Sequence, residues 1–540
     1  MSTRTEDLAY YARGERLVTA AEERKVIIAS SLGTVFEWYD FYLYATLAPF
    51  FAALFFPPGN ETAALLSAFA TYAAGFLVRP FGALVFGHVG DIVGRKFTFL
   101  ITISVMGLAT ALVGFLPTYA TIGVVAPIIL VTLRLLQGLA LGGEYGGAAT
   151  YVAEHSADNK RGFATSWIQT TATFGFFLSL LVIGLCRVLM DADDFRNWGW
   201  RIPFIISLIL LAISVYIRTK LEESPVFQRM KAEGKGSKAP LKDSFLKYPN
   251  NKFVALALFG AVAGQGVVWY TGQFYALFFL TITLKLDFLP AYGLIAASLL
   301  AATPFFVIFG ALSDRIGRKK IIMAGCLIAA LTYFPLFRGL THFINPALEE
   351  YQQRTPITVA ANEDDCNFHI FVGPNTNFTT CDKAKDFLTK SGLSFESVAA
   401  PAGAEVVTRL GNVELRGYNE EEYKAALKQT GYPPKADPDR VNYVMAFLIL
   451  FILVLYVTMV YGPIAAFLVE LFPTNIRYTS MSLPYHIGNG WFGGMLPLLA
   501  TAMVAAAGDI YYGLWYPILV AVMTLIIGTL FLPETKDRSI

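Results

Sequence analysis

Long charge-free apolar stretches dominate this chain and fix its structural class. Four of them cover residues 162–186, 253–284, 288–312 and 441–469, and charged residues bound each one. A helix needs about 20 apolar residues to cross a bilayer, and it satisfies its backbone N–H and C=O groups internally. With 55% hydrophobic and 15% charged residues, the composition lies outside that of soluble domains. The sequence predicts an all-α integral membrane protein.

The apolar stretches predict twelve transmembrane helices. Residues 97–133 are too long for one span, and we divide them at Leu116-Pro117-Thr118, because proline favours a turn. The spans begin near residues 26, 63, 97, 123, 162, 200, 253, 288, 320, 441, 477 and 510. Lysines and arginines, Arg218 among them, gather in alternate loops, which are therefore cytoplasmic. Residues 1–25, which lack a signal-peptide pattern, and residues 533–540 are then cytoplasmic terminal segments.

Two motifs recur along the chain. Residues 87–96 (GHVGDIVGRK) recur as residues 310–319 (GALSDRIGRK), an offset of 223 (310 minus 87). The Glu-x6-Arg spacing of residues 154–161 recurs in residues 470–477, an offset of 316 (470 minus 154). The two offsets differ by 93 (316 minus 223), so if the chain consists of two homologous halves, about 93 residues have been inserted into the second one, between Lys319 and Glu470.

The repeat predicts two six-helix halves and an external inserted domain. The predicted parts are a first half at 26–219, a cytoplasmic linker at 220–252, a second half at 253–342 and 441–532, and the insertion at 343–440, between helices 9 and 10. Residues 345–440 contain 15 acidic and 10 basic residues, as expected of a solvated domain. Parallel halves with a site between them are one known architecture of secondary transporters.

The pattern of the insertion predicts a small α+β unit. We expect strands at 368–372 and within 405–415, a helix beginning near Thr380 and a helix at 419–429. Cys366 and Cys381 close a loop in this domain, and a disulfide would persist there in an oxidising compartment. Two unpaired thiols are the alternative.

Several motifs carry a family resemblance. Besides the repeated loop, they are Glu37-Trp-Tyr-Asp-Phe-Tyr, Arg134-Leu-Leu-Gln-Gly, Gly142-Gly-Glu-Tyr-Gly-Gly, Glu222-Glu-Ser-Pro and Pro533-Glu-Thr-Lys. Over nearly its whole length the chain resembles the major facilitator superfamily. Within that superfamily it resembles the metabolite:proton symporter family of bacterial proline/betaine, α-ketoglutarate, shikimate and citrate carriers. The resemblance implies a monomer of the bacterial inner membrane, although typical members lack the insertion.

Ionisable residues at membrane depth are costly and mark functional sites. Glu37 and Asp40 share one face of the first span, which Tyr44 continues. Two carboxylates repel each other, which favours a proton site, although either one can instead hold an arginine in place. The resemblance implies that Asp40 faces Arg134. Glu144 is predicted to relay protons or to pack.

Arg79 lies twelve residues before Asp91, about 18 Å along a helix, and hence near the middle of the second span. Its planar guanidinium suits a substrate carboxylate. An internal ion pair with Glu37 or Asp40 is the alternative. We expect Arg79 and Tyr44 to bind substrate together with Gln265, Trp269, Tyr270, Gln273, Tyr485, His486 and Asn489. The aromatic residues among them can instead serve packing alone.

Charged residues at the cytoplasmic helix ends predict a gate between the halves. The predicted gate residues are Asp91, Arg95, Glu154, Arg161, Asp314, Arg318, Glu470 and Arg477. A charge network among them would hold the cytoplasmic ends together while the protein faces outward. A purely structural role is the alternative.

These features favour a proton-coupled symporter for a small mono- or dicarboxylate, whose partners are the solute, the proton and the lipid bilayer. The alternatives are a proline/betaine-type zwitterion symporter and a membrane sensor that uses the external domain. No Walker loop, metal-ligand cluster or nucleophile triad occurs in the sequence. We therefore expect no enzyme activity, no cofactor, no metal and no nucleic-acid partner.

Overall fold

The computed structural model describes residues 8–10, 17–56, 61–369 and 377–540. Within these residues, ten helices are long and apolar enough to cross a membrane. They are Arg95–Phe115, Val125–Glu154, Arg161–Leu189, Arg201–Thr219, Asn250–Thr283, Phe288–Ile316, Arg318–Ile344, Tyr443–Leu471, Arg477–Ala507 and Tyr512–Phe531. Two further helices, α1 (Ala20–Phe55) and α2 (Glu61–Ile92), have 36 and 32 residues. The total of twelve spans stays a prediction.

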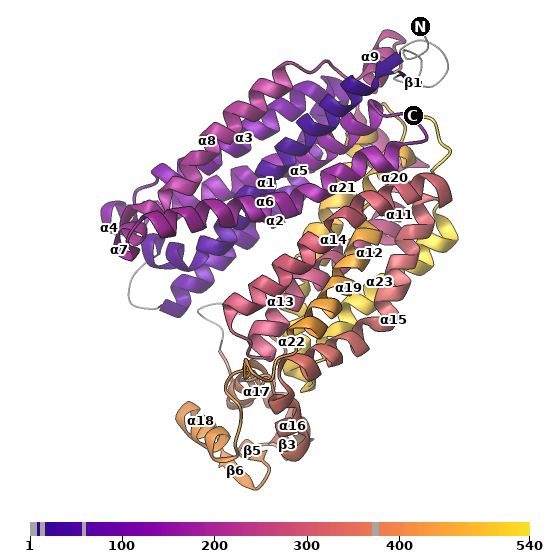
Figure 1. Cartoon of the computed structure of the whole chain (residues 1–540). Coiled ribbons are helices and arrows are strands. Elements are labelled where there is room, and N and C mark those ends of the chain that lie inside the picture. Colours follow the sequence, from indigo (N-terminus) through magenta and orange to yellow (C-terminus); the bar gives the residue numbers. More distant parts are fainter. Residues whose placement is uncertain (1–7, 11–16, 57–60, 370–376) are drawn as a thin grey trace.

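The long helices form two bundles. The first contains α1, α2, α3 (Arg95–Phe115), α5 (Val125–Glu154), α6 (Arg161–Leu189) and α8 (Arg201–Thr219). Its short helices are α4 (Tyr119–Ile122), α7 (Ala192–Asp194) and the π-helix Phe195–Gly199, and the strands β1 (Leu8–Tyr10) and β2 (Leu17–Thr19) precede it. The bundles lie close together at the end where both chain termini lie, and they diverge toward the other end (Figure 1).

The second bundle follows a linker with α9 (Pro225–Ala232) and α10 (Pro240–Phe245). It contains α11 (Asn250–Ala257), α12 (Ala263–Tyr270), α13 (Ala276–Phe278), α14 (Phe288–Ile316), α15 (Arg318–Ile344), α19 (Tyr443–Tyr461), α20 (Ile464–Leu471), α21 (Arg477–Ile487), α22 (Leu496–Ala507) and α23 (Trp515–Phe531). Two of its spans are interrupted by π-helical turns: the span at 250–283, by Leu258–Val262, Thr271–Tyr275 and Phe279–Thr283, and the span at 477–507, by Gly488–Gly493. Such turns are frequent at functional sites.

Glycines on α5 allow α2 to approach closely. A Cβ atom on Gly138 would lie 2.2 Å from the carbonyl oxygen of Gly75, and one on Gly142 would lie 2.2 Å from that of Arg79. Small residues four apart permit this kind of contact between membrane helices. The close packing brings Arg79 of α2 and the polar residues of α5 to the same depth.

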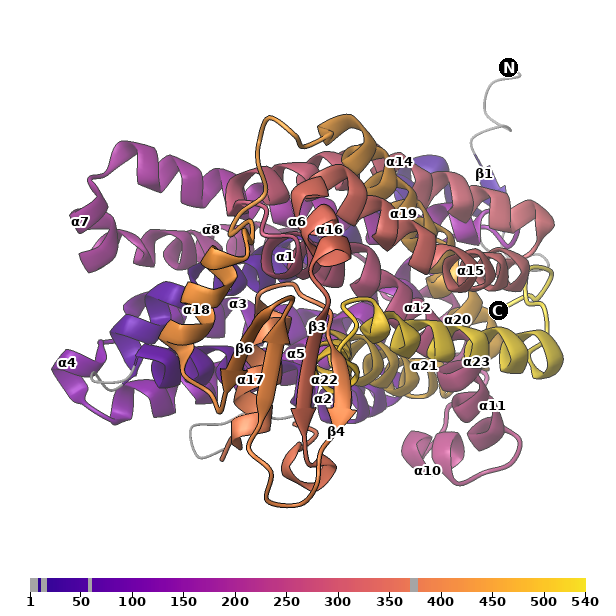
Figure 2. The ribbon, with the colours of Figure 1, turned by 90° about the horizontal axis from the view of Figure 1, so that it is seen from below.

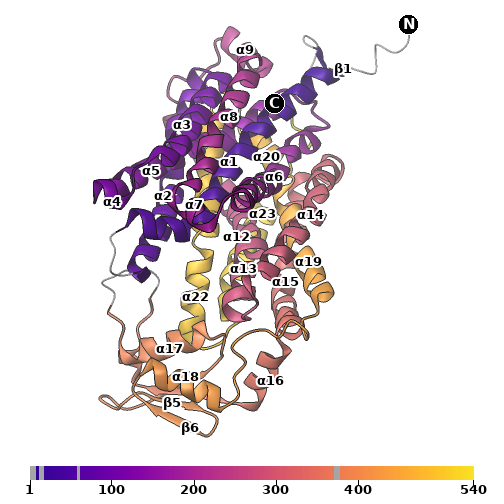
Figure 3. The same ribbon diagram turned by 60° about the vertical axis from the view of Figure 1, so that its left-hand side comes forward.

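The inserted residues form a small α+β domain at the end of the molecule remote from the termini (Figures 1 and 3). It contains α16 (Pro346–Arg354), β3 (Ile357–Ala361), the 3-10 turn Glu363–Asp365, α17 (Thr380–Lys390), β4 (Glu396–Ala399), β5 (Val407–Leu410), β6 (Val413–Arg416) and α18 (Glu420–Gln429). The sheet order is β4-β3-β5-β6, with β3 and β4 parallel and the other pairs antiparallel (Figure 2).

The strand predicted at 368–372 stays a prediction. Phe368 and His369 belong to no strand and lie in a segment tied to α17, and residues 370–372 fall outside the described residues. The helix at Thr380 begins with a capping box, in which Thr379 and Asp382 satisfy each other's backbone N–H groups. The structure also forms a hairpin, β5 and β6, that covers most of the segment 405–415 and extends to Arg416.

The external domain is fastened to the second bundle. The backbone N–H of Phe395 donates to the carbonyl of Gly508 (2.6 Å), and that of Ala436 donates to the carbonyl of Lys285 (3.0 Å). Gly392, at φ +71°, lies so close to the backbone of Thr283 that a Cβ atom would lie 2.0 Å from its carbonyl oxygen. These contacts join the domain to the loops that end the spans at 250–283 and 477–507.

Candidate functional site

A small cavity lies between the two bundles. Its volume is about 30 Å³, room for a few water molecules. The first bundle lines it with Glu37, Trp38, Arg79 and Tyr145, among others, and the second with Trp269, Tyr270, Tyr461, Tyr485, His486 and Asn489. A solute larger than a few waters requires the cavity to expand, so the bundles must move to admit one.

Aromatic side chains of the two bundles meet beside the cavity. The rings of Trp38 and Trp269 lie 5.3 Å apart, and those of Phe41 and Phe274 lie 5.9 Å apart. Trp38 and Phe41 belong to α1, whereas their partners belong to the π-interrupted span at 250–283. This aromatic layer joins the bundles on the side toward the external domain.

Asp40 and Arg134 form a buried ion pair next to the cavity. Arg134 Nη1 lies 3.2 Å from Asp40 Oδ2, and both side chains are about 95% buried. Gln137 Nε2 donates to the other carboxylate oxygen (3.4 Å) and to Thr110 (2.9 Å). The ring of Tyr44 lies 3.7 Å from the Arg134 guanidinium carbon. The family resemblance implied that Asp40 faces Arg134. Gln137 is an additional partner of Asp40.

Glu144 pairs with an arginine that the sequence analysis assigned to a loop. Arg218 Nη2 donates to Glu144 Oε1 (2.6 Å), Thr102 donates to Glu144 Oε2 (2.8 Å), and both charged side chains are 1% exposed. Arg218 also donates to the carbonyl of Phe99 (2.8 Å). Glu144 is therefore balanced within the first bundle.

Glu37 and Arg79 lie in the cavity wall with different partners. The Arg79 guanidinium stacks on Phe76, 4.2 Å from the ring centroid, and its buried Nε has no hydrogen-bond partner among the described residues. Glu37 is 8% exposed and, within the same part of the chain, forms neither a hydrogen bond nor an ion pair. The cavity thus holds one guanidinium and one carboxyl group that the described protein groups leave unpaired.

The second bundle contributes a wall of hydroxyl, amide and ring groups. Tyr485 stacks on Tyr145, with the centroids 3.6 Å apart, and shares a hydrogen bond with Tyr461 (2.8 Å). Asn489 and Gln265 exchange two hydrogen bonds of 3.0 Å. The π-helical turn at Gly488–Gly493 begins just before Asn489, which sets this amide against the other interrupted span.

Three predicted substrate contacts lie outside the cavity wall. Tyr44 packs under Arg134, Gln265 supports Asn489 from behind, and Gln273 is buried in the second bundle at 5% exposure. Conversely, Trp38, Tyr145 and Tyr461 line the cavity without having been predicted. In the quoted motifs, Trp38 directly follows Glu37 and Tyr145 directly follows Glu144. Their position next to an intramembrane carboxylate could have indicated that they line the cavity.

The predicted gate residues gather into two buried charge clusters at the end of the molecule where both chain termini lie (Figure 1). In one, Arg477 of the second bundle lies 2.8 Å from Glu154 of the first, which also lies 3.6 Å from Arg95. In the other, Glu470 of the second bundle lies 3.1 Å from Arg161 of the first and 2.9 Å from Arg318. Each cluster therefore crosses from one bundle to the other.

The loop aspartates cap helices of the opposite bundle. Asp91 accepts hydrogen bonds from the backbone N–H groups of Tyr478 (3.3 Å) and Thr479 (2.8 Å), in the first turn of α21. Asp314 accepts from those of Gly162 and Phe163 (2.9 Å each), in the first turn of α6. A carboxylate at a helix N-terminus is stabilised by the helix dipole. Each bundle thus completes a helix of the other.

A second pair of matching contacts was missed in the sequence analysis. Glu223 accepts from the backbone N–H of Arg95 (3.2 Å), while the neighbouring Ser224 donates to Glu154. In the other half, Glu534 accepts from the backbone N–H of Arg318 (2.8 Å), while Thr535 donates to Glu470 (2.7 Å). Both segments were recognised as family motifs, but their sequences alone gave no partner for them.

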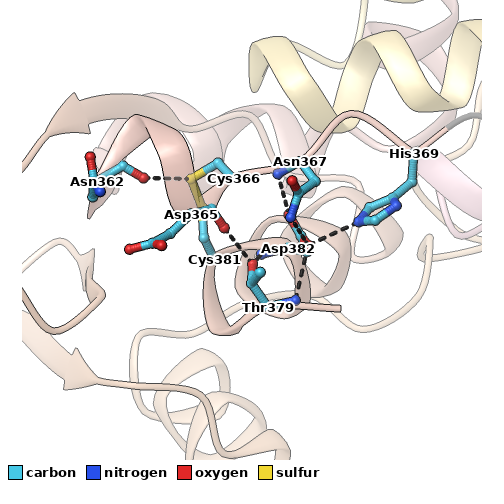
Figure 4. Close-up of a disulfide and its surroundings, with 8 residues drawn as sticks. All are labelled: Asn362, Asp365, Cys366, Asn367, His369, Thr379, Cys381 and Asp382. Carbon is cyan, nitrogen blue, oxygen red and sulfur yellow. Dashed lines mark hydrogen bonds and ion pairs between the residues drawn. A yellow bond between two sulfur atoms is a disulfide. The ribbon is translucent and has the colours of Figure 1, made fainter. Parts of the chain in front are cut away.

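Cys366 and Cys381 form a disulfide that ties the segment after β3 to α17 (Figure 4). Beside it, Asp382 accepts hydrogen bonds from Asn367 (2.7 Å) and His369 (2.9 Å). Burial raises the pKa of Asp382, but the hydrogen bonds from His369 and from the backbone N–H groups of Thr379 and Asn367 outweigh it and lower the pKa to about 2. Among the described residues, no cluster of histidine, cysteine, aspartate and glutamate suits a metal ion.

Comparison with known transporters agrees with this architecture. A shikimate transporter of Escherichia coli is 37% identical over 333 residues, which are 60% of this chain and 74% of that protein. A proline/betaine transporter of Salmonella typhimurium is 37% identical over 323 residues, 58% of this chain and 64% of its own length. An α-ketoglutarate permease of Escherichia coli is 33% identical over 333 residues, 61% of this chain and 76% of that protein.

The fold is that of the major facilitator superfamily. The structure of the proton:xylose symporter XylE bound to 6-bromo-6-deoxy-D-glucose superposes with a TM-score of 0.67 at 16% identity, over 96% of this chain and 98% of that one. The model of the family described as "Sugar (and other) transporter" matches residues 25–247 and 428–540, and the gap between these two ranges includes the external domain. The chain therefore belongs to the sugar (and other) transporter family of the major facilitator superfamily, as a multi-pass membrane transporter.

Proposed function

We propose that this transporter imports a small carboxylate together with protons by alternating access, as a monomer of the bacterial inner membrane with both termini in the cytoplasm. The observation that supports the carboxylate is the state of the charges around the cavity. Asp40 is paired with Arg134, and Glu144 with Arg218, whereas the Arg79 guanidinium faces the cavity without a described carboxylate at ion-pair distance. An arginine fork presents parallel donors that match a carboxylate.

The Asp40–Arg134 pair is the proposed site of proton coupling. A proton on Asp40 removes the negative charge that holds Arg134 at 3.2 Å. Arg134 is then left with the ring of Tyr44, and the span that carries Asp40 is free to shift relative to α5. Coupling requires that this shift accompany solute binding, and Glu37, in the wall between Asp40 and Arg79, is placed to sense both events.

The cytoplasmic charge clusters supply the other half of the proposed cycle. They are intact here, so the cytoplasmic side is closed, and the aromatic layer at Trp38 and Trp269 must separate for a solute to arrive from outside. Closing that layer around the solute and breaking the clusters would then release the solute and the proton inside.

The presence of Glu37 in the cavity wall favours a zwitterion as the second candidate substrate. A carboxyl group and a guanidinium in one cavity match the two charges of an amino acid or a betaine, and the rings of Trp38 and Trp269 suit a cationic ammonium group. The proline/betaine transporter among the relatives points the same way. The protonation state of Glu37 separates the candidates: a charged Glu37 favours the zwitterion, and a neutral one favours the anion.

Proteoliposomes containing an internal pH dye test both candidates. Carboxylates and zwitterions are added singly, and internal acidification identifies the co-transported solute. Asp40→Asn is expected to bind labelled solute without acidification. Arg79→Ala is expected to raise the half-saturating concentration of a carboxylate by roughly tenfold or more, because a charge-assisted contact is lost. Arg416→Ala, on the surface of the external domain, is the control and should leave both quantities unchanged.

The outcomes are distinct. Acidification by carboxylates alone supports the proposal, and acidification by zwitterions alone supports the second candidate. If labelled solute binds but nothing acidifies the lumen, the chain is a sensor or a uniporter, and the coupling role of Asp40 is wrong.

A further inference from the structure

In the topology proposed above, on which this inference rests, Arg338 lies at the outer boundary of the membrane. It follows Arg318, at the cytoplasmic end of α15, by 20 residues (338 minus 318), which is about 30 Å along the helix. That distance equals the thickness of the hydrocarbon core. Phe334, one turn further inward, contacts Trp515 at the start of α23, with the ring centroids 5.2 Å apart. Aromatic residues of this kind mark the interface between lipid and water.

A cavity of about 260 Å³ adjoins Arg338. It lies where the outer end of α15 meets α16 of the external domain, which extends from that end (Figure 3), and the loop before α23. Gln352 lies on the far side of the cavity. Its side-chain amide accepts from the backbone N–H of Ser394 and donates to the backbone carbonyl of Ser394, at 2.8 Å each. The insertion therefore supplies walls that α15 and α23 by themselves would not have.

The charged groups of this cavity are one cation and one anion. Arg338 is exposed and, among the described residues, forms no ion pair or hydrogen bond, its guanidinium carbon lying 5.8 Å from the ring centroid of Tyr511. Glu349, on the same cavity, accepts from His342 Nδ1 (2.8 Å), which leaves its other carboxylate oxygen available. A phosphate can bind to the first group and a primary ammonium to the second.

The membrane face below the cavity is apolar and open. Leu331 on α15 is 70% exposed, and Trp515 and Leu519 on α23 are 43% and 60% exposed. These residues lie within two helical turns of the cavity, toward the membrane centre. Acyl chains of a lipid whose headgroup occupies the cavity would cover them.

We propose that this cavity binds the headgroup of a zwitterionic phospholipid of the outer leaflet, with its phosphate on Arg338 and its primary ammonium on Glu349. A purely anionic headgroup would fit this charge pair less well, because Glu349 would repel it. It also disfavours a choline headgroup, which has no N–H to donate to a carboxylate.

Native mass spectrometry of the full chain with defined lipids tests this site. Phosphatidylethanolamine is expected to remain bound, and phosphatidylcholine and phosphatidylglycerol to dissociate at lower collision energy. Arg338→Ala should weaken phosphatidylethanolamine binding by roughly tenfold or more, and Glu349→Gln should reduce its preference over phosphatidylcholine. Arg315→Ala, an exposed arginine at the cytoplasmic end of α14, is the matched control.

Two results would overturn the proposal. One is equal retention of phosphatidylethanolamine by the unchanged chain and by Arg338→Ala. The other is equally tight binding of soluble glycerophosphoethanolamine, which would make this a site for a free phosphate ester. Arg338→Lys keeps the charge and should retain part of the binding, so a loss caused by misfolding is recognised by comparing the two variants.

Discussion

Glu154 and Arg477, 323 residues apart in the chain, lie 2.8 Å apart across the boundary between the two bundles. Glu470 and Arg161 repeat the relationship with the partners exchanged, at 3.1 Å. Each cluster takes its acid from one bundle and the bridging arginine from the other. Neither bundle can rotate away at this end without breaking both clusters.

Removing one bridging arginine should therefore open the cytoplasmic side. Arg477→Ala leaves Glu154 without its partner across the boundary, and breaking a buried pair of this kind costs about 3 to 5 kcal/mol of the closed state. Ser482→Cys, in a chain with Cys186 and Cys326 replaced by alanine, reports the change, since Ser482 is buried between the bundles. We expect its maleimide labelling from the cytoplasmic side to accelerate at least tenfold; equal rates would contradict the gate. Arg416→Ala serves as the control.

The Glu144–Arg218 pair should behave as a structural unit. Arg218→Met leaves a buried carboxylate uncompensated and should lower stability by about 3 to 5 kcal/mol, whereas Glu144→Gln with Arg218→Met should recover most of the loss. Thermal unfolding in detergent, followed by tryptophan fluorescence, measures both variants. If the double variant is as stable as the wild type but no longer couples protons, Glu144 is a relay as well.

The external domain should move as part of the second bundle. A cross-link between Ser394→Cys and Ile510→Cys, whose hydroxyl oxygen and backbone nitrogen lie 3.2 Å apart, is expected to leave transport unchanged. A cross-link between Thr173→Cys and Thr303→Cys, whose hydroxyl oxygens lie 2.9 Å apart across the bundles, should stop transport until it is reduced. Loss of transport with the first cross-link would show that the domain must detach during the cycle.

The disulfide should stabilise the external domain. It closes a loop with a sequence separation of 15, for which the reduction in unfolded-state entropy is worth about 3 kcal/mol. Cys366→Ser with Cys381→Ser should therefore unfold the domain at a lower temperature, as a reducing agent should do in the wild type. Limited proteolysis with rising temperature, probed at residues 343–440, distinguishes the domain from the membrane part. A reducing agent should have no further effect on the variant.

Asp382 should give the domain an acid-sensitive stability. Its pKa is lowered to about 2 from an ordinary value near 3.8, so its contribution is fully present above about pH 4 and is lost as the pH falls toward 2. Asp382→Asn should lower stability at pH 7 and flatten its decrease between pH 4 and pH 2. Asp386→Asn, at a surface pair with Lys390, is the matched control and should keep the wild-type profile.

Short-range patterns predicted the parts of this molecule that local chemistry decides. The charged residues that join the bundles, such as Asp91 and Arg318, were singled out because charges at helix ends repeat at fixed spacing. The helix at Thr380 was predicted from the local sequence pattern, and the structure starts it with a capping box of Thr379 and Asp382. The spans themselves follow from the requirement that the backbone be satisfied in lipid.

Long-range packing decided the rest. Tyr461 and Tyr145 line the cavity, but helices that are apolar on all sides do not reveal which face turns inward. Arg218 was assigned to a cytoplasmic loop, whereas the packing of α8 on α3 buries it against Glu144. The strands β3 and β4 were not predicted, since five and four residues are too few to establish a period.

The burial of the two charge clusters also decides how salt acts on this end of the molecule. The side chains of Glu154, Glu470 and Arg161 are fully buried while the bundles are closed, so dissolved ions do not screen them. If the bundles part at this end, the same charges become exposed, and counterions gather around them. Higher ionic strength should then favour the parted arrangement and leave the closed one unaffected.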